Sequence, residues 1–140
     1  MPHAQPERIH ILVVDGYAGW RDGVATALRH AGYQVTECRT AAEALAVGLA
    51  PGAHFDLLLT EAELRDSTGL ALGRQLRRAH RGLRVLFMGY SLASAGPALL
   101  SKPFSLLRLE RVVSRTLVRP PVRSITQVLS GYFPTCGDPA

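Results

Sequence analysis

The sequence predicts a single α/β domain built on a parallel sheet, and three observations support this class. Near-continuous apolar runs, typical of strands buried on both faces, occur at 9–14, 55–60 and 84–88. Segments with apolar residues at helical spacing separate these runs. Strands that alternate with helices of about 10 to 15 residues indicate right-handed βαβ units, with helices on both faces of one parallel sheet.

The first part of the chain supplies two strands and two helices. A strand at 9–14 is followed by a helix at 20–31, which a glycine ends. Residues 33–37 alternate between polar and apolar side chains, as a strand near the edge of a sheet does. Thr40 caps the next helix, because Glu43 three residues later completes a capping box.

The second part of the chain supplies three further strands. The strand at 55–60 leads to a helix that begins at Thr68 or Gly69. Residues 84–88 form the fourth strand and residues 98–101 a short fifth strand. These elements complete a five-stranded sheet.

The last helix begins after Ser105, which caps it, and ends near residue 118, before two consecutive prolines. The connection at 89–97, between the fourth and fifth strands, is too short for two loops and an ordinary helix. Two glycines and a proline within it also disfavour helix. We therefore expect the fourth helix to be shortened or missing.

Length and composition are those of one globular domain. The chain has 140 residues, of which 47% are hydrophobic and 19% charged. We divide it into an arm at 1–8, a domain at 9–118 and a tail at 119–140. No apolar run approaches the roughly 18 to 20 residues of a membrane span, and the start lacks the apolar stretch of a signal peptide. We expect a cytoplasmic protein with no membrane segment.

The tail carries one apolar pattern. A short helix at 124–133 would place five apolar side chains on one face: Ile125, Val128, Leu129, Tyr132 and Phe133. This segment would pack over the surface left by the missing fourth helix or mediate homodimerisation. The alternative is a disordered tail.

The formal charge is +5, and 15 of the 16 basic residues are arginine, which leaves Lys102 as the only lysine. We attribute the arginine excess to genome base composition rather than to nucleic-acid binding. Four arginines form a stripe along the last helix: Arg108, Arg111, Arg115 and Arg119. Such a stripe is typical of a solvated helix face, and the functional alternative is a docking face for an acidic partner.

Candidate functional residues follow several of the strands. In open parallel sheets the working site lies at the carboxyl ends of the strands, near the point where strand order reverses. Asp15, Glu61, Gly89 and Lys102 all fall at or just past those ends. The sequence therefore predicts a site that these positions share.

The order of motifs along 9–118 resembles the receiver domain of bacterial two-component response regulators. The motifs are Val13-Val14-Asp15, Gly32-Tyr33-Gln34-Val35, Asp56-Leu57-Leu58-Leu59, Gly69-Leu70 and Lys102-Pro103-Phe104. The resemblance implies a CheY-like, flavodoxin-like fold: a doubly wound five-stranded parallel sheet with strand order 2-1-3-4-5.

The resemblance also implies a phosphoacceptor pocket, which is degenerate in this chain. Family receivers have an aspartate where Glu61 stands, and it accepts a phosphoryl group from a histidine kinase. Of the acidic residues that hold Mg²⁺ after the first strand, Asp15 is kept but the next position is Gly16. The hydroxyl residue at the end of the fourth strand is replaced by Gly89, and the switch aromatic by Leu99.

These departures predict a pseudo-receiver with no catalytic residues and no enzyme activity. Lys102 would pair with Glu61, Asp15 or both, and so occupy the place of phosphate and metal. We expect Mg²⁺ binding to be weak or lost, because Mg²⁺ requires near-octahedral oxygen ligation. The pocket would hold one fixed conformation, and whether that state is active-like or inactive-like is left open.

The predicted function is that of a stand-alone, phosphorylation-independent protein–protein interaction module. Its partner would be a signalling protein, such as a sensor histidine kinase or another regulator. Two alternatives remain. One is a receiver still phosphorylated at a displaced carboxylate, Asp15 or Asp66, and the other is a basic nucleic-acid-associated regulator. The scattered histidines and the two cysteines show no metal-ligand spacing.

Overall fold

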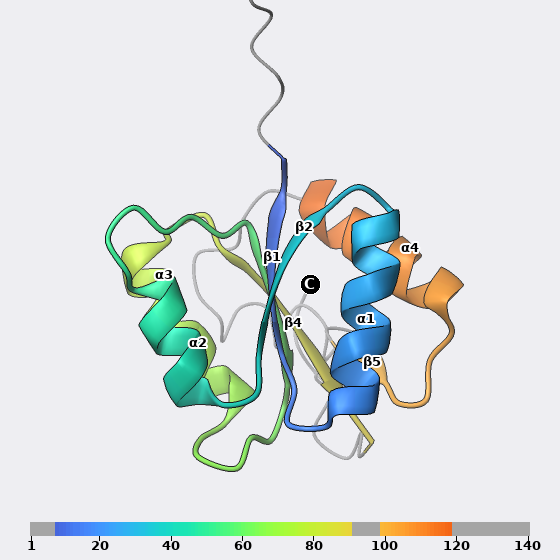
Figure 1. The fold of residues 1–140 in the computed structure, drawn as a ribbon, viewed down its shortest axis with the longest axis horizontal. Coiled ribbons are helices and arrows are strands. Elements are labelled where there is room, and N and C mark those ends of the chain that lie inside the picture. The colour runs from blue at the N-terminus through green and yellow to red at the C-terminus, as the bar shows by residue number, and fades with distance from the viewer. Residues whose placement is uncertain (1–7, 91–98, 119–140) are drawn as a thin grey trace, which may run out of the picture.

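A computed structural model describes residues 8–90 and 99–118 (Figure 1). The described residues form five strands and four helices. In chain order they are β1 His10–Val14, α1 Ala18–His30, β2 Gln34–Cys38, α2 Ala41–Gly48, β3 Leu57–Glu61, α3 Gly69–Ala79, β4 Arg84–Gly89, β5 Leu99–Ser101 and α4 Leu106–Val118. Most of the connection for which we predict a shortened or missing fourth helix, the segment of the predicted tail helix and nearly all of the N-terminal arm lie outside the described residues.

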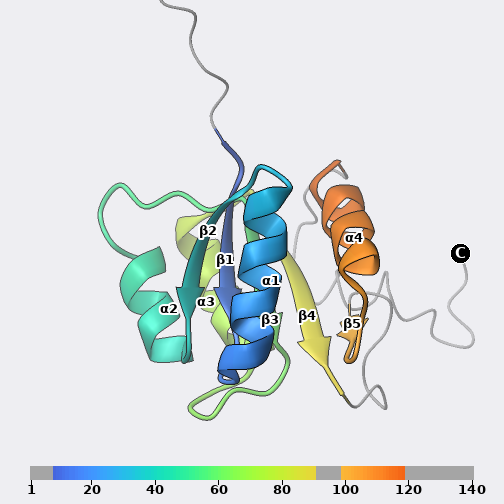
Figure 2. The same cartoon turned by 45° about the vertical axis from the view of Figure 1, so that its right-hand side comes forward.

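The five strands form one sheet in the order β2-β1-β3-β4-β5, and all neighbouring strands are parallel. This confirms the predicted fold class and strand order. Helices α1 and α4 cover one face of the sheet, and α2 and α3 cover the other (Figures 1 and 2). Strand order reverses between β1 and β3, so their carboxyl ends flank the crevice where sites form in such sheets.

Alternating side chains of the central strands fill the two halves of the core. Leu12 and Leu58 belong to the apolar cluster that includes α2 and α3, whereas Ile11 and Leu59 belong to the cluster that includes α1 and α4. All four side chains are fully buried. The central strands are therefore buried on both faces, as their apolar runs indicate.

Three helices begin at the capping residues that the sequence indicates. The side-chain oxygens of Thr40, Thr68 and Ser105 each accept a hydrogen bond from a backbone N–H in the first helical turn, at 3.1 Å. The capping box of α2 differs in one bond. The Glu43 carboxylate accepts the N–H of Arg39 rather than that of Thr40, because it also binds the Arg39 guanidinium.

The observed bounds differ from the predicted ones by one or two residues. Glu61 is the last residue of β3, whereas the sequence pattern ends the strand one residue earlier. Helix α1 begins at Ala18, two residues earlier than predicted, because Tyr17 precedes it without a side-chain capping bond that would mark its start. None of the helices in the described part of the chain is long and apolar enough to cross a membrane.

Candidate functional site

Three of the predicted site residues meet at the carboxyl ends of the strands, at the lower edge of the sheet in Figure 1. Asp15 follows β1, Glu61 ends β3 and Lys102 follows β5. The backbone holds the ends together: the N–H of Lys102 donates to the carbonyl of Gly89 at 2.7 Å. Residues separated by up to 87 positions in sequence thus share one pocket.

Lys102 pairs with both carboxylates but unequally. Its Nζ lies 2.6 Å from Asp15 Oδ2 and 3.8 Å from Glu61 Oε1. The side chains of Lys102 and Asp15 are 1% and 0% exposed, whereas that of Glu61 is 26% exposed. The short, dry pair is therefore Asp15–Lys102, and Glu61 is a second, more solvated neighbour. A buried pair of this kind is stable only because each charge has its partner.

Both carboxylate oxygens of Asp15 have a donor in this structure. Its second oxygen, Oδ1, accepts the backbone N–H of Tyr17 at 2.8 Å. The backbone carbonyl of Asp15 accepts a hydrogen bond from the Arg21 guanidinium at 2.8 Å, and the backbone N–H of Asp15 donates to the carbonyl of Cys38. The aspartate is thus fixed from both its side chain and its backbone.

Glu61 is held more loosely. Its Oε2 accepts the N–H of Gly16 at 3.4 Å, a long hydrogen bond. Burial raises the pKa of Glu61, and the neighbouring Asp15 carboxylate raises it further, although Lys102 and the Gly16 N–H act in the opposite direction. When both carboxylates are ionised, the pocket contains two negative charges and one positive charge.

Two aromatic side chains complete the surroundings of Lys102. Its ammonium lies 5.1 Å from the centre of the Trp20 ring and 5.4 Å from that of Tyr90, both within cation–π range. The Trp20 indole N–H donates to the Tyr90 hydroxyl at 2.7 Å. Sequence reasoning missed both residues as parts of the site. The available signals were that Trp20 is the only tryptophan and that Tyr90 directly follows a strand end.

The remaining predicted pocket positions contribute no polar side chain. Gly89 is the last residue of β4, and a Cβ built there would meet Leu99 and Ala62 only at ordinary contact distances, 3.8 to 4.0 Å. Leu99 is buried in the cluster beneath α2 and α3. Gly16 is exposed and offers only its backbone N–H. None of these three side chains carries a hydroxyl group.

The loop after β3 is fastened at both ends. A Cβ on Gly69 would lie 2.6 Å from the carbonyl oxygen of Glu61, so only glycine permits this close return of the chain. Asp66 accepts the N–H groups of Ala41 and Ala42, at 3.0 and 2.9 Å, and so caps α2 from a distant loop. These bonds lower the pKa of Asp66. Its carboxylate serves α2 and is not brought to Lys102 by any contact in the described residues.

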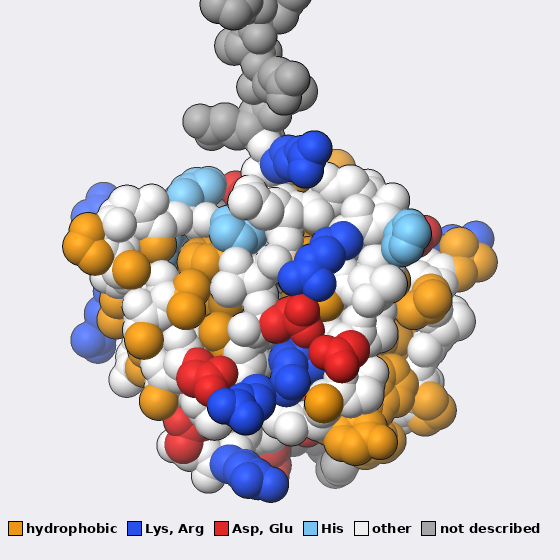
Figure 3. Space-filling model, in the orientation of Figure 1, with side chains coloured by type: hydrophobic (Ala, Val, Ile, Leu, Met, Phe, Trp, Pro, Cys, Tyr) orange, Lys and Arg blue, Asp and Glu red, His pale blue; other side chains and the backbone are white. Residues whose placement is uncertain are grey.

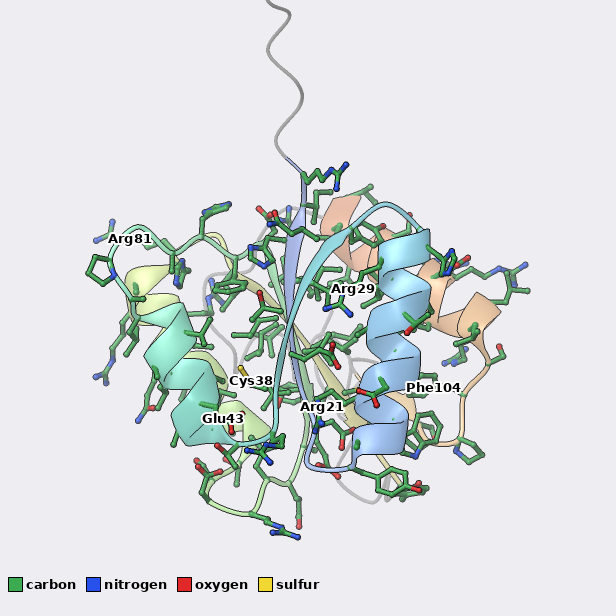
Figure 4. The ribbon with its side chains drawn as sticks, in the orientation of Figure 1. Arg21, Arg29, Cys38, Glu43, Arg81 and Phe104 are labelled. Carbon is green, nitrogen blue, oxygen red and sulfur yellow. The ribbon has the colours of Figure 1, made fainter. Side chains whose placement is uncertain are left out.

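Two groups of arginines differ in their surroundings. Arg108, Arg111 and Arg115 are exposed on α4, as predicted, and Arg119 lies outside the described residues. On the face where α1 lies beside β2, by contrast, basic and acidic side chains lie next to one another (Figure 3). Arg29 and Arg21 lie between α1 and β2 (Figure 4) and contact the Glu37 carboxylate at 3.0 and 3.8 Å. The positive charge on that face is partly compensated.

Comparison with known proteins shows the same fold and family. Residues 11–113 match the family model of the response regulator receiver domain. The chain is 30% identical over 116 residues to the sensor kinase CckA of Brucella abortus, covering 76% of this chain and 12% of the kinase. It is 28% identical over 151 residues to the probable transcriptional regulatory protein TcrX of Mycobacterium tuberculosis, covering 99% of this chain and 61% of that protein.

A solved structure agrees with these relationships. The chemotaxis response regulator CheY4 of Vibrio cholerae superimposes with a TM-score of 0.68 at 26% identity, over 79% of this chain and 99% of that one. The chain spans 12% and 61% of the two relatives named above, so their whole-protein activities do not transfer with the match. Receiver domains are signalling modules that interact with kinases and other regulators. The chain belongs to the response regulator receiver domain family of two-component signalling.

Proposed function

We propose that this receiver acts as a phosphorylation-independent protein–protein interaction module. The observation that carries the proposal is the 2.6 Å Asp15–Lys102 ion pair, whose two side chains are at most 1% exposed. A cation already neutralised by a buried carboxylate has little attraction left for an incoming phosphoryl group. Phosphoryl transfer depends on free positive charge at the transferring group.

Glu61 stands where the family resemblance expects the acceptor aspartate. Its carboxylate extends one methylene further from the backbone, which changes the position and angle from which it would attack a phosphodonor. Burial and the Asp15 charge also raise the pKa of Glu61. The altered position of the carboxylate supports the loss of acceptor function.

The residues of the pocket do not fit a Mg²⁺ site. Both carboxylate oxygens of Asp15 are engaged by N–H or ammonium donors, and Gly16 has no side-chain oxygen. Across residues 8–90 and 99–118, no three His, Cys, Asp or Glu side chains gather in a metal-holding arrangement. Mg²⁺ would compete with Lys102 for the Asp15 carboxylate. We therefore assign the pocket no metal-dependent step.

The positions expected to transmit phosphorylation are also changed. Gly89 offers no hydroxyl to a phosphoryl group, and Leu99 is 5% exposed and packed into the core. A side chain packed at core density is held in a low-energy rotamer by its neighbours. These features support a fixed conformation whose surfaces are recognised as they stand.

A signalling protein, such as a sensor histidine kinase or another regulator, is the proposed partner. The exposed arginines of α4, Arg108, Arg111 and Arg115, form the proposed contact face for an acidic surface. A homodimer is the other assembly to test. The displaced-acceptor alternative gains little support, because Asp66 caps α2 and Asp15 binds Lys102.

An NMR titration of isotope-labelled protein tests the proposal. Mg²⁺ is added first and beryllofluoride, a phosphoryl mimic, second. We expect the amides of Asp15, Glu61 and Lys102 to stay unmoved. Saturable shifts at these amides that extend along β4 and β5 would reject the proposal and restore a phosphorylation switch. Labelling by acetyl phosphate, lost in Asp66→Asn but kept in Glu61→Gln, would instead identify a displaced acceptor.

A further inference from the structure

The pocket is bounded by a contact between a side chain of α1 and the side chain that follows β4. Trp20 belongs to α1 and Tyr90 follows β4, and the indole N–H of one donates to the hydroxyl of the other at 2.7 Å. Both rings lie within 5.4 Å of the Lys102 ammonium. Trp20 is further supported by Phe104, whose ring centre lies 4.9 Å away. The ammonium thus has a carboxylate and two joined aromatic rings as neighbours.

We propose that Trp20 and Tyr90 form an aromatic closure over Lys102, which keeps small oxyanions such as phosphate out of the pocket. This inference deepens the proposed function and rests on it. The ion pair with Asp15 neutralises the charge of Lys102, and the aromatic closure keeps an anion from reaching the ammonium.

The exposed fractions of the side chains around Lys102 support the closure. The Lys102 side chain is 1% exposed although the neighbouring Glu61 side chain is 26% exposed. The pocket is therefore open to solvent on the Glu61 side but closed around the ammonium. Tyr90 itself is 65% exposed, so its ring is the outer member and Trp20, which is partly buried, the inner one. An anion would have to separate the two rings to contact Nζ from that side.

The stabilisation is mutual. Aromatic faces attract a cation most strongly where water is excluded, and the ammonium in turn orients the two rings. The negative faces of the rings and the Asp15 carboxylate would repel an approaching oxyanion. The closure therefore discriminates by charge as well as by size.

The chain carries its own probe for a direct test. Lys102 is the only lysine, so amine-acylating reagents modify this side chain and otherwise only the chain's amino terminus. Peptide mass spectrometry separates the two sites. The rate of Lys102 acylation then measures access to the ammonium in the intact protein, with the amino terminus as an internal reference.

Tyr90→Ala is the test variant and Tyr17→Ala its matched control. Both tyrosines are 65% exposed, but only Tyr90 lies over Lys102. We expect Tyr90→Ala to accelerate Lys102 acylation by about tenfold relative to the amino terminus, because access then no longer requires local opening. Tyr17→Ala should leave the ratio unchanged. Tyr90→Phe, which keeps the ring and loses the hydroxyl, should fall between them.

A second readout addresses the anion. Inorganic phosphate should slow Lys102 acylation in Tyr90→Ala and leave the wild-type rate unchanged. Equal acylation in Tyr90→Ala and wild type would overturn the closure, and so would an equal increase in Tyr17→Ala. Acceleration without phosphate protection would overturn its role against anions. Beryllofluoride binding by the wild-type protein would contradict the proposed function instead, so the two failures are separable.

Discussion

Replacing Lys102 with methionine removes the ammonium from the pocket while keeping an unbranched apolar side chain of similar length. Asp15 then loses its contact at 2.6 Å and keeps only the N–H of Tyr17 on its other oxygen. The carboxylate remains fully buried, with Glu61 as a second negative neighbour. The variant therefore leaves a buried charge without its partner.

The size of the effect follows from this burial. Removing one partner of a buried ion pair costs about 3–5 kcal/mol, whereas removing an exposed pair costs about 0–1 kcal/mol. Side-chain exposures of 1% and 0% place Asp15–Lys102 in the first class. The remaining Tyr17 hydrogen bond and relaxation toward solvent favour the lower end, roughly 3 kcal/mol. At an m-value of about 1.5 kcal/mol/M, the urea midpoint falls by roughly 2 M.

Equilibrium urea unfolding followed by Trp20 fluorescence measures this change, and far-UV circular dichroism provides a second probe of the same transition. The matched control is Lys102→Met combined with Asp15→Asn, which removes both charges. The double variant should lose much less stability than the sum of its single variants. A single-variant loss below about 1 kcal/mol, or strict additivity, would refute the view that the pair is dry and mutually dependent.

Three further changes test the loop and the second carboxylate. Because the pKa of Glu61 is raised above its ordinary value of 4.5, its ionisation opposes folding, so the free energy of unfolding should fall as pH rises above that value. Glu61→Gln should remove that fall, and parallel pH profiles for variant and wild type would contradict the assignment. Asp66→Ala should speed hydrogen exchange at the Ala41 amide, since that N–H loses its acceptor, whereas unchanged protection would show that the cap is not formed in solution. Gly69→Ala should cost roughly 2 kcal/mol in urea unfolding because its Cβ meets a backbone oxygen at 2.6 Å. Gly82→Ala, whose Cβ meets nothing within 4 Å, is the control, and an equal cost in both would reject the steric argument.

The fold was predictable because its central strands carry an unusually simple signal. The runs at β1 and β3 are apolar at successive positions, and this requires burial on both faces and hence helices on both sides. Helices α2, α3 and α4 began where hydroxyl caps stand in the sequence. Helix α1 has no such cap, and there the predicted start was two residues late.

The site was predictable in part, for a reason of topology. Parallel strands end at one edge, so Asp15, Glu61 and Lys102 lie along the same edge of the sheet. Side-chain length and burial decide which of the two carboxylates lies closer to the Lys102 ammonium. Burial follows from packing and not from the spacing of residues in the sequence. The contribution of Trp20 and Tyr90 depends on the rotation of α1 about its axis and on the path of the chain after β4. Sequence pattern specifies neither.

The alternation of side chains along β1 and β3 affects how cooperatively the domain unfolds. Adjacent residues Leu58 and Leu59 anchor opposite apolar clusters through the same stretch of backbone. Neither cluster can lose its order without disturbing the strand that the other requires. The two halves are therefore expected to melt together in one cooperative transition, and Leu58→Ala and Leu59→Ala to lower a shared melting temperature rather than to split it.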